Sequence, residues 1–389
     1  MSIGHNRFVQ KIFMENSITT SRAAVLEAVG QPLALRRFPL LSQAPPGGVL
    51  VRTLMAGICG TDVHLWKGQL PIKLPVILGH ETVGTIVSLG DGVEQDWNGR
   101  ELRVGDRITW NSTTSCGRCF YCAVKRQPTR CPHRRAYGIG YVSDQPPHLL
   151  GGYADYHYLM PRATIFKLSE ALDTDTVIGA GCGLLTAIHG IERTGLQWGD
   201  VVVVQGSGPV GLSAIAVARA AGASKVLVIG GPSARLSIAR RFGADAVLDI
   251  SEATSAAARI DWVRSHTDGY GADAVLEGVG APEAVVEGME MCRDGGKYLI
   301  LGHYCDAGAV AWNPHVVTRK QLQVVGSWSS EPRHMKAALE FLERDRDRFP
   351  FASLITHRFD LEQAEEALQT SAAWQCGKCV LAPDPGRVS

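Results

Sequence analysis

The run VVVVQGSGPVGLSAIAVARAAGA, which begins at Val201, limits the possible folds more than any other segment of the chain. Four valines form a short apolar strand, a glycine-rich turn follows, and the alanine-rich stretch after it is typical of a helix. The runs KVLVIGG, SARLSIARRFGA and AVLDI then continue the alternation of strand and helix. Such alternation is typical of a parallel sheet that is covered by helices. We therefore predict an α/β, doubly wound domain in this part of the chain.

The turn has the spacing G-x-G-x-x-G. This motif alone is weak, but a strand before it and a helix after it are the context of a dinucleotide-binding, or Rossmann, turn. The first glycine permits the tight turn, the second lets the backbone approach a pyrophosphate, and the third lets helix and strand pack closely. Free N–H groups at the helix N-terminus would then bind the phosphates. We predict a dinucleotide site formed by Gly206, Gly208, Pro209, Val210 and Gly211, with a purely structural turn as the alternative.

The second strand lacks the acidic residue that often follows it in such domains. Gly230 and Gly231 stand where a carboxylate would bind the ribose 2′-hydroxyl of NAD. Nothing there would repel the 2′-phosphate of NADP, and Ser233 and Arg235 follow closely enough to approach one. Arg235 can instead cover the adenine ring or cap the helix. The sequence therefore leaves NAD and NADP open, with NAD favoured.

The composition excludes several functional classes. The 389 residues carry a formal net charge of +1, so no strong field attracts nucleic acid or an anionic membrane. The N-terminus has scattered charge and no long apolar core, unlike a secretion signal. No apolar run reaches about 18 residues, the length of a membrane span. We expect a cytoplasmic protein whose partners include neither nucleic acid nor a membrane.

Four cysteines crowd the run CGRCFYCAVKRQPTRC at Cys116, Cys119, Cys122 and Cys131. This close packing of thiols suits a tetrahedral zinc ion, and a zinc held by four sulfurs has no open position for chemistry. The alternative is a set of buried or disulfide-paired cysteines, which the tight spacing and the expected reducing compartment disfavour. We predict a structural zinc site here and expect the chemistry to lie elsewhere.

A second set of metal-binding residue types lies in three separate segments. Cys59 occurs in GICGTDVH, His80 and Glu81 in LGHETVG, and Cys182 in AGCGLLTAIHG. Each residue alone would more often belong to the core. Between about residues 23 and 160 the surrounding pattern is short apolar runs separated by glycine and proline, which predicts a mostly β region.

Together these segments resemble the zinc-containing alcohol dehydrogenases of the medium-chain dehydrogenase/reductase superfamily. The resemblance runs from about residue 23 to 383, through GICGTDVH, LGHETVG, the four-cysteine loop, GGYADY, GCGLLTA, GSGPVG and GKCVL. It implies a GroES-like, mostly β catalytic domain beside a doubly wound Rossmann cofactor-binding domain. The expected bounds are a flexible extension at 1–20, the catalytic domain at 21–185 and 327–389, and the Rossmann domain at 186–326.

The resemblance implies two zinc ions per chain. Cys59, His80 and Cys182 would bind the catalytic ion, a set that leaves its fourth position open, and Glu81 would lie behind it as an alternate ligand or outer contact. Asp62 would orient His80 through its second ring nitrogen. The four-cysteine loop would hold the other ion. Its last gap is eight residues where the family usually has seven, a small change for a loop.

The resemblance also implies a proton path and further cofactor contacts. Thr61 would bond the reacting oxygen, and His64 would pass the released proton toward solvent through the cofactor ribose, since a histidine can carry a proton near neutral pH. Besides the turn and the segment with Gly230, Gly231 and Arg235, the cofactor would contact Gly278, Val279, Leu301, Gly302, His303 and, at the pyrophosphate, Lys378.

The predicted reaction is hydride transfer between a small-molecule alcohol and NAD or NADP, which gives a ketone or an aldehyde. Zinc would act as a Lewis acid, and the cofactor would carry the hydride. A secondary or cyclic alcohol is favoured, and a primary one stays open. We name Trp66, Trp110 and Tyr137 as pocket walls or, equally, as ordinary packed aromatics. The resemblance further implies a homodimer or homotetramer.

Two alternatives remain at this stage. One is a polyol or amino-alcohol dehydrogenase of the same superfamily, which Cys182 disfavours because the polyol relatives often use a carboxylate as the third zinc ligand. The other is a dinucleotide-binding protein that has lost its activity. The intact set of Cys59, Thr61, His64, His80 and Cys182 disfavours it.

Overall fold

The computed structural model describes residues 17–383, and these residues divide into two units. The first unit holds 17–179, 331–336 and 351–383, and the second holds 180–330 and 337–350. Most of the expected N-terminal extension at 1–20 lies outside the described residues, and its last four residues belong to strand β1, which begins at Ser17. No helix described between residues 17 and 383 combines the length and the apolar character that a membrane crossing requires.

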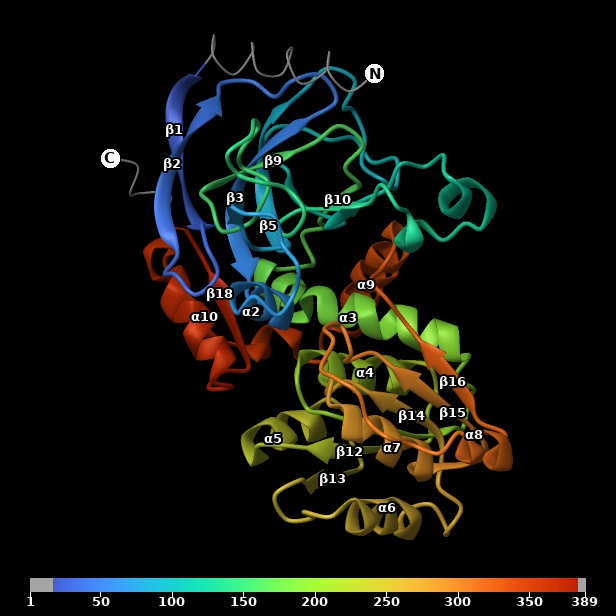
Figure 1. Cartoon of the computed structure of the whole chain (residues 1–389). Helices are drawn as coiled ribbons and strands as arrows, with labels where there is room; N and C mark the ends of the chain where they lie inside the picture. Colours follow the sequence, from blue (N-terminus) through green and yellow to red (C-terminus); the bar gives the residue numbers. More distant parts are fainter. Residues whose placement is uncertain (1–16, 384–389) are drawn as a thin grey trace. The chain divides into compact units, whose positions relative to one another are not determined.

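The first unit is built on a seven-stranded sheet in the order β10-β6-β5-β3-β18-β17, with β9 also paired to β3 (Figure 1). A separate three-stranded sheet has the order β2-β1-β4, and β7 pairs with β8. The last strand, β18, runs antiparallel to β3 and so brings the C-terminal segment into this sheet. The strands are β1 Ser17–Leu26, β2 Ala34–Leu41, β3 Val49–Gly57, β4 Val76–Ile77, β5 Glu81–Leu89, β6 Arg107–Trp110, β7 Thr113–Thr114, β8 Arg135–Ala136, β9 Tyr156–Leu159, β10 Ile165–Lys167, β17 Ile355–Phe359 and β18 Lys378–Leu381.

Short helices connect these strands, and two clusters of apolar side chains form the cores of the unit. Trp110 and Tyr137 are buried in one of these cores, at 3% and 0% exposure, so neither can line an open pocket. Trp66 is partly buried against the other core. The helices are α2 Gly60–Trp66, η1 Phe120–Val124, η2 Pro128–Arg130, η3 Phe351–Leu354, η4 Leu361–Gln363 and α10 Ala364–Ala372; α3 Thr174–Thr194 and α9 Pro332–Asp345 are shared with the second unit.

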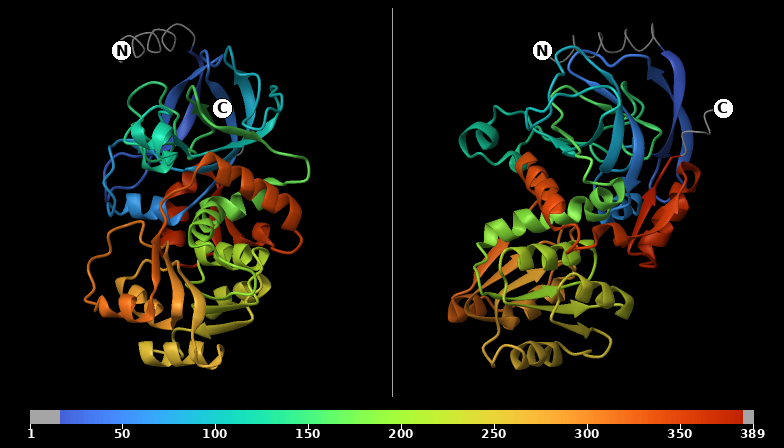
Figure 2. Two further views of the ribbon diagram at one scale, coloured as in Figure 1. Left: turned by 90° about the vertical axis from the view of Figure 1, so that its right-hand side faces the viewer. Right: turned by 180° about the vertical axis from the view of Figure 1, so that it is seen from behind.

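The second unit contains a parallel six-stranded sheet in the order β13-β12-β11-β14-β15-β16. Figure 2 shows helices on both of its faces, so the predicted doubly wound α/β fold is confirmed. The order reverses between β11 and β14, the place where such sheets bind ligands at the carboxyl ends of the strands. The elements are β11 Val201–Gln205, α4 Pro209–Ala220, β12 Lys225–Gly230, α5 Ser233–Arg241, β13 Ala246–Asp249, α6 Ala256–Ser265, β14 Ala272–Glu277, α7 Pro282–Met291, β15 Cys292–Ile300, α8 His315–Lys320 and β16 Gln323–Gly326.

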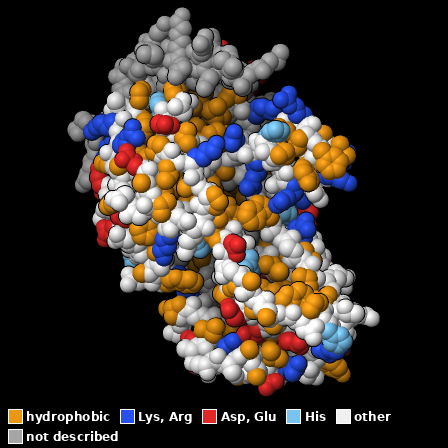
Figure 3. Space-filling view, viewed as in Figure 1, with side chains coloured by type: hydrophobic (Ala, Val, Ile, Leu, Met, Phe, Trp, Pro, Cys, Tyr) orange, Lys and Arg blue, Asp and Glu red, His pale blue; other side chains and the backbone are white. Residues whose placement is uncertain are grey.

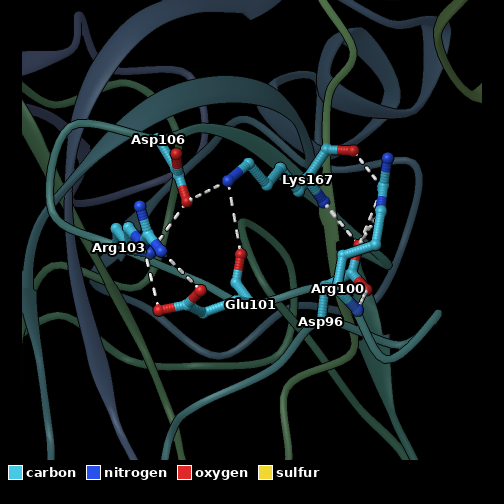
Figure 4. A network of polar contacts seen from close by, with 6 residues as sticks. All are labelled: Asp96, Arg100, Glu101, Arg103, Asp106 and Lys167. Atoms are coloured by element: carbon cyan, nitrogen blue, oxygen red, sulfur yellow. Dashed lines mark hydrogen bonds and ion pairs between the residues drawn. The ribbon is translucent and has the colours of Figure 1, made fainter.

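A buried carboxylate organises the loop between β5 and β6 (Figure 4). The Asp96 side chain is 0% exposed and accepts hydrogen bonds from the backbone N–H groups of Asn98 and Arg100, at 2.8 and 2.9 Å. Its second oxygen accepts from the Arg100 guanidinium, at 2.7 and 2.9 Å, and from the N–H of Lys167 at 3.0 Å. Asp96 therefore ties this loop to β10.

We expect Asp96→Asn to destabilise the protein by about 2–4 kcal/mol at neutral pH, because Arg100 loses its buried partner. Burial alone would raise the pKa of Asp96, but the hydrogen bonds from Arg100 and Lys167 outweigh it and hold the pKa below its ordinary value. A depressed pKa in the folded state stabilises the fold above the ordinary aspartate pKa of about 4, and this contribution disappears as the pH falls through the folded-state value.

Urea unfolding of both proteins between pH 7 and pH 3 measures this effect. The difference in the free energy of unfolding between the wild type and Asp96→Asn should be largest at neutral pH and shrink in acid. Glu101→Gln removes a mostly exposed carboxylate of the same network and should change stability little. An Asp96→Asn penalty that stays constant down to pH 3 would contradict the assignment.

Candidate active site

The first part of the site is the N-terminus of α2, where Cys59 is the residue that caps the helix. The N–H of Cys59 donates to Asp62 Oδ2 at 2.9 Å, and the Cys59 side chain accepts from the backbone three residues into the helix. This reciprocal pair is a capping box in which cysteine and aspartate take the usual places of serine and glutamate. The sequence CGTD thus forms the start of the helix and also holds the Cys59 thiol in one position.

Asp62 also holds the segment that carries His80. Its Oδ1 lies 3.3 Å from His80 Nδ1 and accepts from the N–H of Gly79 at 3.4 Å, and its side chain is 0% exposed. Asp62 therefore holds the Nδ1 side of the ring, as expected when a carboxylate orients a metal-binding histidine. Burial lowers the pKa of His80, but the Asp62 carboxylate and the Cys59 thiolate raise it well above its ordinary value. The surroundings of His80, with Asp62 and Cys59 beside it, therefore favour positive charge.

Cys182 lies on α3, three residues after Gly179, which is the last residue of the first segment of the first unit. The helix is interrupted at Gly181, whose φ of 48° and ψ of −151° suit glycine. The ligand atoms of Cys59, His80, Glu81 and Cys182 all lie within 4.8 Å of one another. Two thiols, an imidazole and a carboxylate at this spacing fit a zinc ion, because zinc binds such ligands at about 2.0–2.3 Å.

Glu81 and Lys378 form a buried ion pair behind this group. Lys378 Nζ lies 2.6 Å from Glu81 Oε2, and the two side chains are 3% and 4% exposed. Gly57 makes room for them, since a Cβ there would lie 2.4 Å from the same Glu81 oxygen. The sequence predicted a role for each residue but not their contact, because they are far apart in the chain and meet through the pairing of β3 with β5 and β18.

Thr61 and His64 lie half-buried on α2, three residues apart and therefore on neighbouring positions of one helix face. His64 Nδ1 lies 2.6 Å from Gln69 Oε1. An amide oxygen can only accept, so this contact places the proton on Nδ1 and leaves Nε2 of a neutral His64 as an acceptor. Gln69 was absent from the predicted residues. Its position shortly after the end of α2 was the only available signal.

The glycine-rich turn in the second unit has the geometry that its three glycines require. Gly206 has a φ of 103°, and a Cβ on Gly211 would lie 2.0 Å from the carbonyl oxygen of Gly206. Gly208 is the N-cap of α4, and Pro209 follows at its first position. Among residues 17–383, and apart from its chain neighbours, a Cβ on Gly208 would have one atom within 4 Å, Arg235 Nη1 at 4.0 Å. The turn is thus tight, packed against its helix, and open where a pyrophosphate would approach.

The loops after β14 and β15 lie together through a buried carboxylate that the sequence did not reveal. Glu277 is 0% exposed, and its Oε1 accepts from the N–H groups of Val279 and Gly280, both at 2.6 Å. Its Oε2 accepts from the N–H of Gly302 at 3.0 Å and lies 3.9 Å from His303 Nε2. Leu301 is buried beside them. The predicted cofactor residues of both loops therefore share one end of the sheet.

The four-cysteine loop also gathers its sulfurs. The ligand atoms of Cys116, Cys119, Cys122 and Cys131 lie within 4.8 Å of one another, and Cys131 Sγ is 3.6 and 3.8 Å from the sulfurs of Cys116 and Cys119. The longer last gap therefore does not remove Cys131 from the cluster. The N–H of Arg118 is the main cause that lowers the pKa of Cys116 to about 6, which favours the thiolate that zinc needs. Where this loop projects in Figure 1, Figure 3 shows hydrophobic and basic side chains at the surface.

Comparisons with known proteins agree with this arrangement. Residues 45–170 match the alcohol dehydrogenase GroES-like domain, and residues 209–344 match the zinc-binding dehydrogenase family. The 5-exo-hydroxycamphor dehydrogenase of Pseudomonas putida is 34% identical over 345 residues, which cover 88% of this chain and 93% of that protein. The chain belongs to the zinc-binding alcohol dehydrogenase family. It is an oxidoreductase that acts on the alcohol group of a small molecule and uses zinc and NAD or NADP.

Solved structures agree with the family assignment. An alcohol dehydrogenase from Thermotoga maritima is 36% identical, has a TM-score of 0.89, and is matched over 94% of this chain and 100% of its own. A zinc-binding dehydrogenase from Sinorhizobium meliloti 1021, solved with NADP bound, is 29% identical with a TM-score of 0.81 and the same coverage of 94% and 100%. The predictions of a medium-chain dehydrogenase and of a GroES-like domain with a Rossmann domain are confirmed.

Proposed function

We propose that this dehydrogenase oxidises secondary or cyclic alcohols to ketones, with two zinc ions per chain and with NAD favoured over NADP. The observation that carries the proposal is the grouping of the Cys59, His80, Glu81 and Cys182 ligand atoms within 4.8 Å of one another. A relative that is 34% identical is named for a hydroxycamphor, which is a cyclic alcohol. Residues 21–185 and 327–389 would form the catalytic domain and 186–326 the cofactor domain, in a homodimer or homotetramer.

Cys59, His80 and Cys182 would hold the catalytic zinc, which supplies a Lewis acid when bound. Asp62 keeps the first two ligands in place because it accepts a hydrogen bond from the Cys59 N–H and contacts the His80 ring. Lys378 pairs with Glu81 and neutralises its charge, so the carboxylate stays behind the thiols as an outer contact rather than as a further ligand.

Thr61 and His64 would remove the proton of the substrate hydroxyl. The Thr61 hydroxyl would accept that proton while donating its own toward the cofactor ribose, and His64, whose Nδ1 faces Gln69, would pass the proton on to solvent. The turn at Gly206 and the loops beside Glu277 would bind the nicotinamide cofactor, which supplies hydride chemistry when bound.

A panel of primary, secondary, cyclic and polyhydric alcohols, followed by the absorbance of the reduced cofactor, tests the proposal. We expect kcat/KM to be at least about tenfold higher for secondary or cyclic alcohols than for polyols, because pockets discriminate by this amount through apolar contacts. A preference for polyols would support the polyol or amino-alcohol alternative. If the zinc-loaded protein oxidises no alcohol with either cofactor, the non-catalytic alternative stands.

A further inference from the structure

Position 230, at the end of β12, has no room for the acidic side chain that often binds the ribose in such domains. A Cβ on Gly230 would lie 2.7 Å from Ser207 Oγ and 3.0 Å from the Ser207 nitrogen. Ser207 occupies this space for a structural purpose, since its hydroxyl donates to the Gly231 carbonyl at 3.0 Å and accepts from the Gly231 N–H at 3.2 Å. The glycine-rich turn is thereby tied to the end of β12, and no carboxylate can extend from position 230.

A carboxylate reaches the same place from the neighbouring strand. β13 runs parallel to β12, and its last residue, Asp249, is the register partner of Gly230. Asp249 Oδ1 lies 3.5 Å from the position that a Cβ on Gly231 would occupy. An aspartate at position 231 would project its own oxygens into this same space. Asp249 therefore presents its charge where the missing acidic residue would have presented one.

The carboxylate of Asp249 is held in place and remains able to bind a ligand. Its Oδ1 accepts from the hydroxyl of Ser251 at 2.7 Å and from the Ser251 N–H at 3.0 Å. These two bonds lower the pKa of Asp249, so the side chain is charged at neutral pH. Both bonds use Oδ1. Within residues 17–383 no hydrogen bond or ion pair engages Oδ2, which can accept from a ribose hydroxyl.

We infer that Asp249 supplies, from β13, the carboxylate that binds the adenosine ribose of the cofactor and selects NAD over NADP. A carboxylate accepts hydrogen bonds from the ribose hydroxyls of NAD, and it repels the 2′-phosphate of NADP. The inference rests on the proposed use of the turn at Gly206 as the cofactor site.

Arg235 does not oppose this assignment. Its Nη1 lies 4.0 Å from the Cβ position of Gly208, at the N-terminus of α4, where the pyrophosphate common to both dinucleotides would bind. No Arg235 atom lies within 4 Å of the Cβ position of Gly231, whereas Asp249 Oδ1 does. The nearer charge at the end of β12 is therefore negative.

Titration of the full-length, zinc-loaded protein with NADH and NADPH, followed by calorimetry, tests this inference without requiring turnover. We expect the protein to bind NADH more tightly than NADPH. In Asp249→Asn the Kd for NADH should rise about 10- to 100-fold, because a charge-assisted hydrogen bond is lost, while the Kd for NADPH stays equal or falls. Glu252→Gln removes an exposed carboxylate from the following turn and should leave both constants unchanged.

A second variant restores the carboxylate from the other strand. Position 231 has ordinary contacts around a Cβ, with Asp249 Oδ1 at 3.5 Å and Ile250 Cγ2 at 3.7 Å, so it can accept a side chain. Gly231→Asp in the Asp249→Asn background should recover the preference for NADH, which a merely unfolded or distorted protein would not do.

The binding constants distinguish a failure of the Asp249 assignment from a failure of the cofactor site itself. A wild-type preference for NADPH, or an unchanged ratio of the two constants in Asp249→Asn, overturns the role of Asp249 while the cofactor site stands. If the folded wild-type protein binds neither dinucleotide, the proposed cofactor site is wrong, and the role of Asp249 falls with it.

Discussion

Cys59→Ser is expected to bind one zinc ion per chain instead of two. Its kcat/KM should fall by more than about a hundredfold, because loss of an outer contact to a metal already costs up to that much and a direct ligand should cost more. The loss should be large because Cys59 supplies one of only two sulfurs in its group. A serine hydroxyl stays protonated at neutral pH, so it is a poor replacement for a thiolate ligand. The fold should survive, since serine is a good residue at a helix N-cap.

Elemental analysis after dialysis, together with steady-state kinetics, measures both parts of this expectation. Cys305→Ser is the matched control, because Cys305 is a half-buried cysteine of the second unit outside both metal groups. It should keep two zinc ions and full activity. The affinity for NADH should stay unchanged in both variants. A Cys59→Ser protein with two zinc ions or with full activity would show that the catalytic metal assignment is wrong.

Cys119→Ser is expected to lose the other zinc ion and to lower Tm by about 5–15 °C, if the metal stabilises its loop as much as a cross-link of 2–4 kcal/mol does. The loop between Cys116 and Cys131 has little apolar packing of its own, since Phe120, Tyr121 and Val124 are 56%, 40% and 66% exposed. Apart from local backbone hydrogen bonds, the contacts among the sulfur atoms connect the two ends of the loop. The catalytic group uses none of these sulfurs, so the remaining folded protein should keep its KM for the alcohol.

Scanning calorimetry and zinc analysis test this second expectation, again with Cys305→Ser as control. Cys119→Ser should hold one zinc ion, melt earlier and keep measurable activity below its new Tm. An unchanged Tm after loss of the ion would mean that the metal does not stabilise the fold. Complete loss of activity in a folded variant at low temperature would show that this site takes part in catalysis.

The local motifs could be recognised from the chain alone because their residues are close together. The strand, glycine turn and helix after Val201 appear as predicted, and the four cysteines of the loop converge despite the longer gap before Cys131. Short-range geometry decides such features, since a turn or a loop of a few residues leaves few arrangements. The catalytic set was different, because only the family resemblance connected Cys59, His80 and Cys182.

Buried polar partners could not be predicted from the sequence. Glu277 and the pair of Glu81 with Lys378 are wholly or almost wholly buried, and nothing in their local sequence distinguishes them from exposed charges. The same holds for Trp110 and Tyr137, which the sequence left open as pocket walls or packed aromatics and which the structure places in a core. Burial depends on which strands pair, and strand pairing joins segments that are far apart in the chain.

The sequence by itself predicted the α/β fold with its dinucleotide turn, the two sets of candidate metal ligands, and the family of zinc-binding alcohol dehydrogenases. The fold, the turn and the four-cysteine set follow from the spacing and periodicity of neighbouring residues, whereas the catalytic set and the family follow from the resemblance of several motifs along the chain. Only the tertiary structure showed that Asp62, which was expected beside His80, also holds Cys59, that Lys378 pairs with Glu81, and that Asp249 lies where an acid at the end of β12 would have lain. Each of these depends on the distance between two segments, and that distance is set by sheet pairing and helix packing across the whole unit.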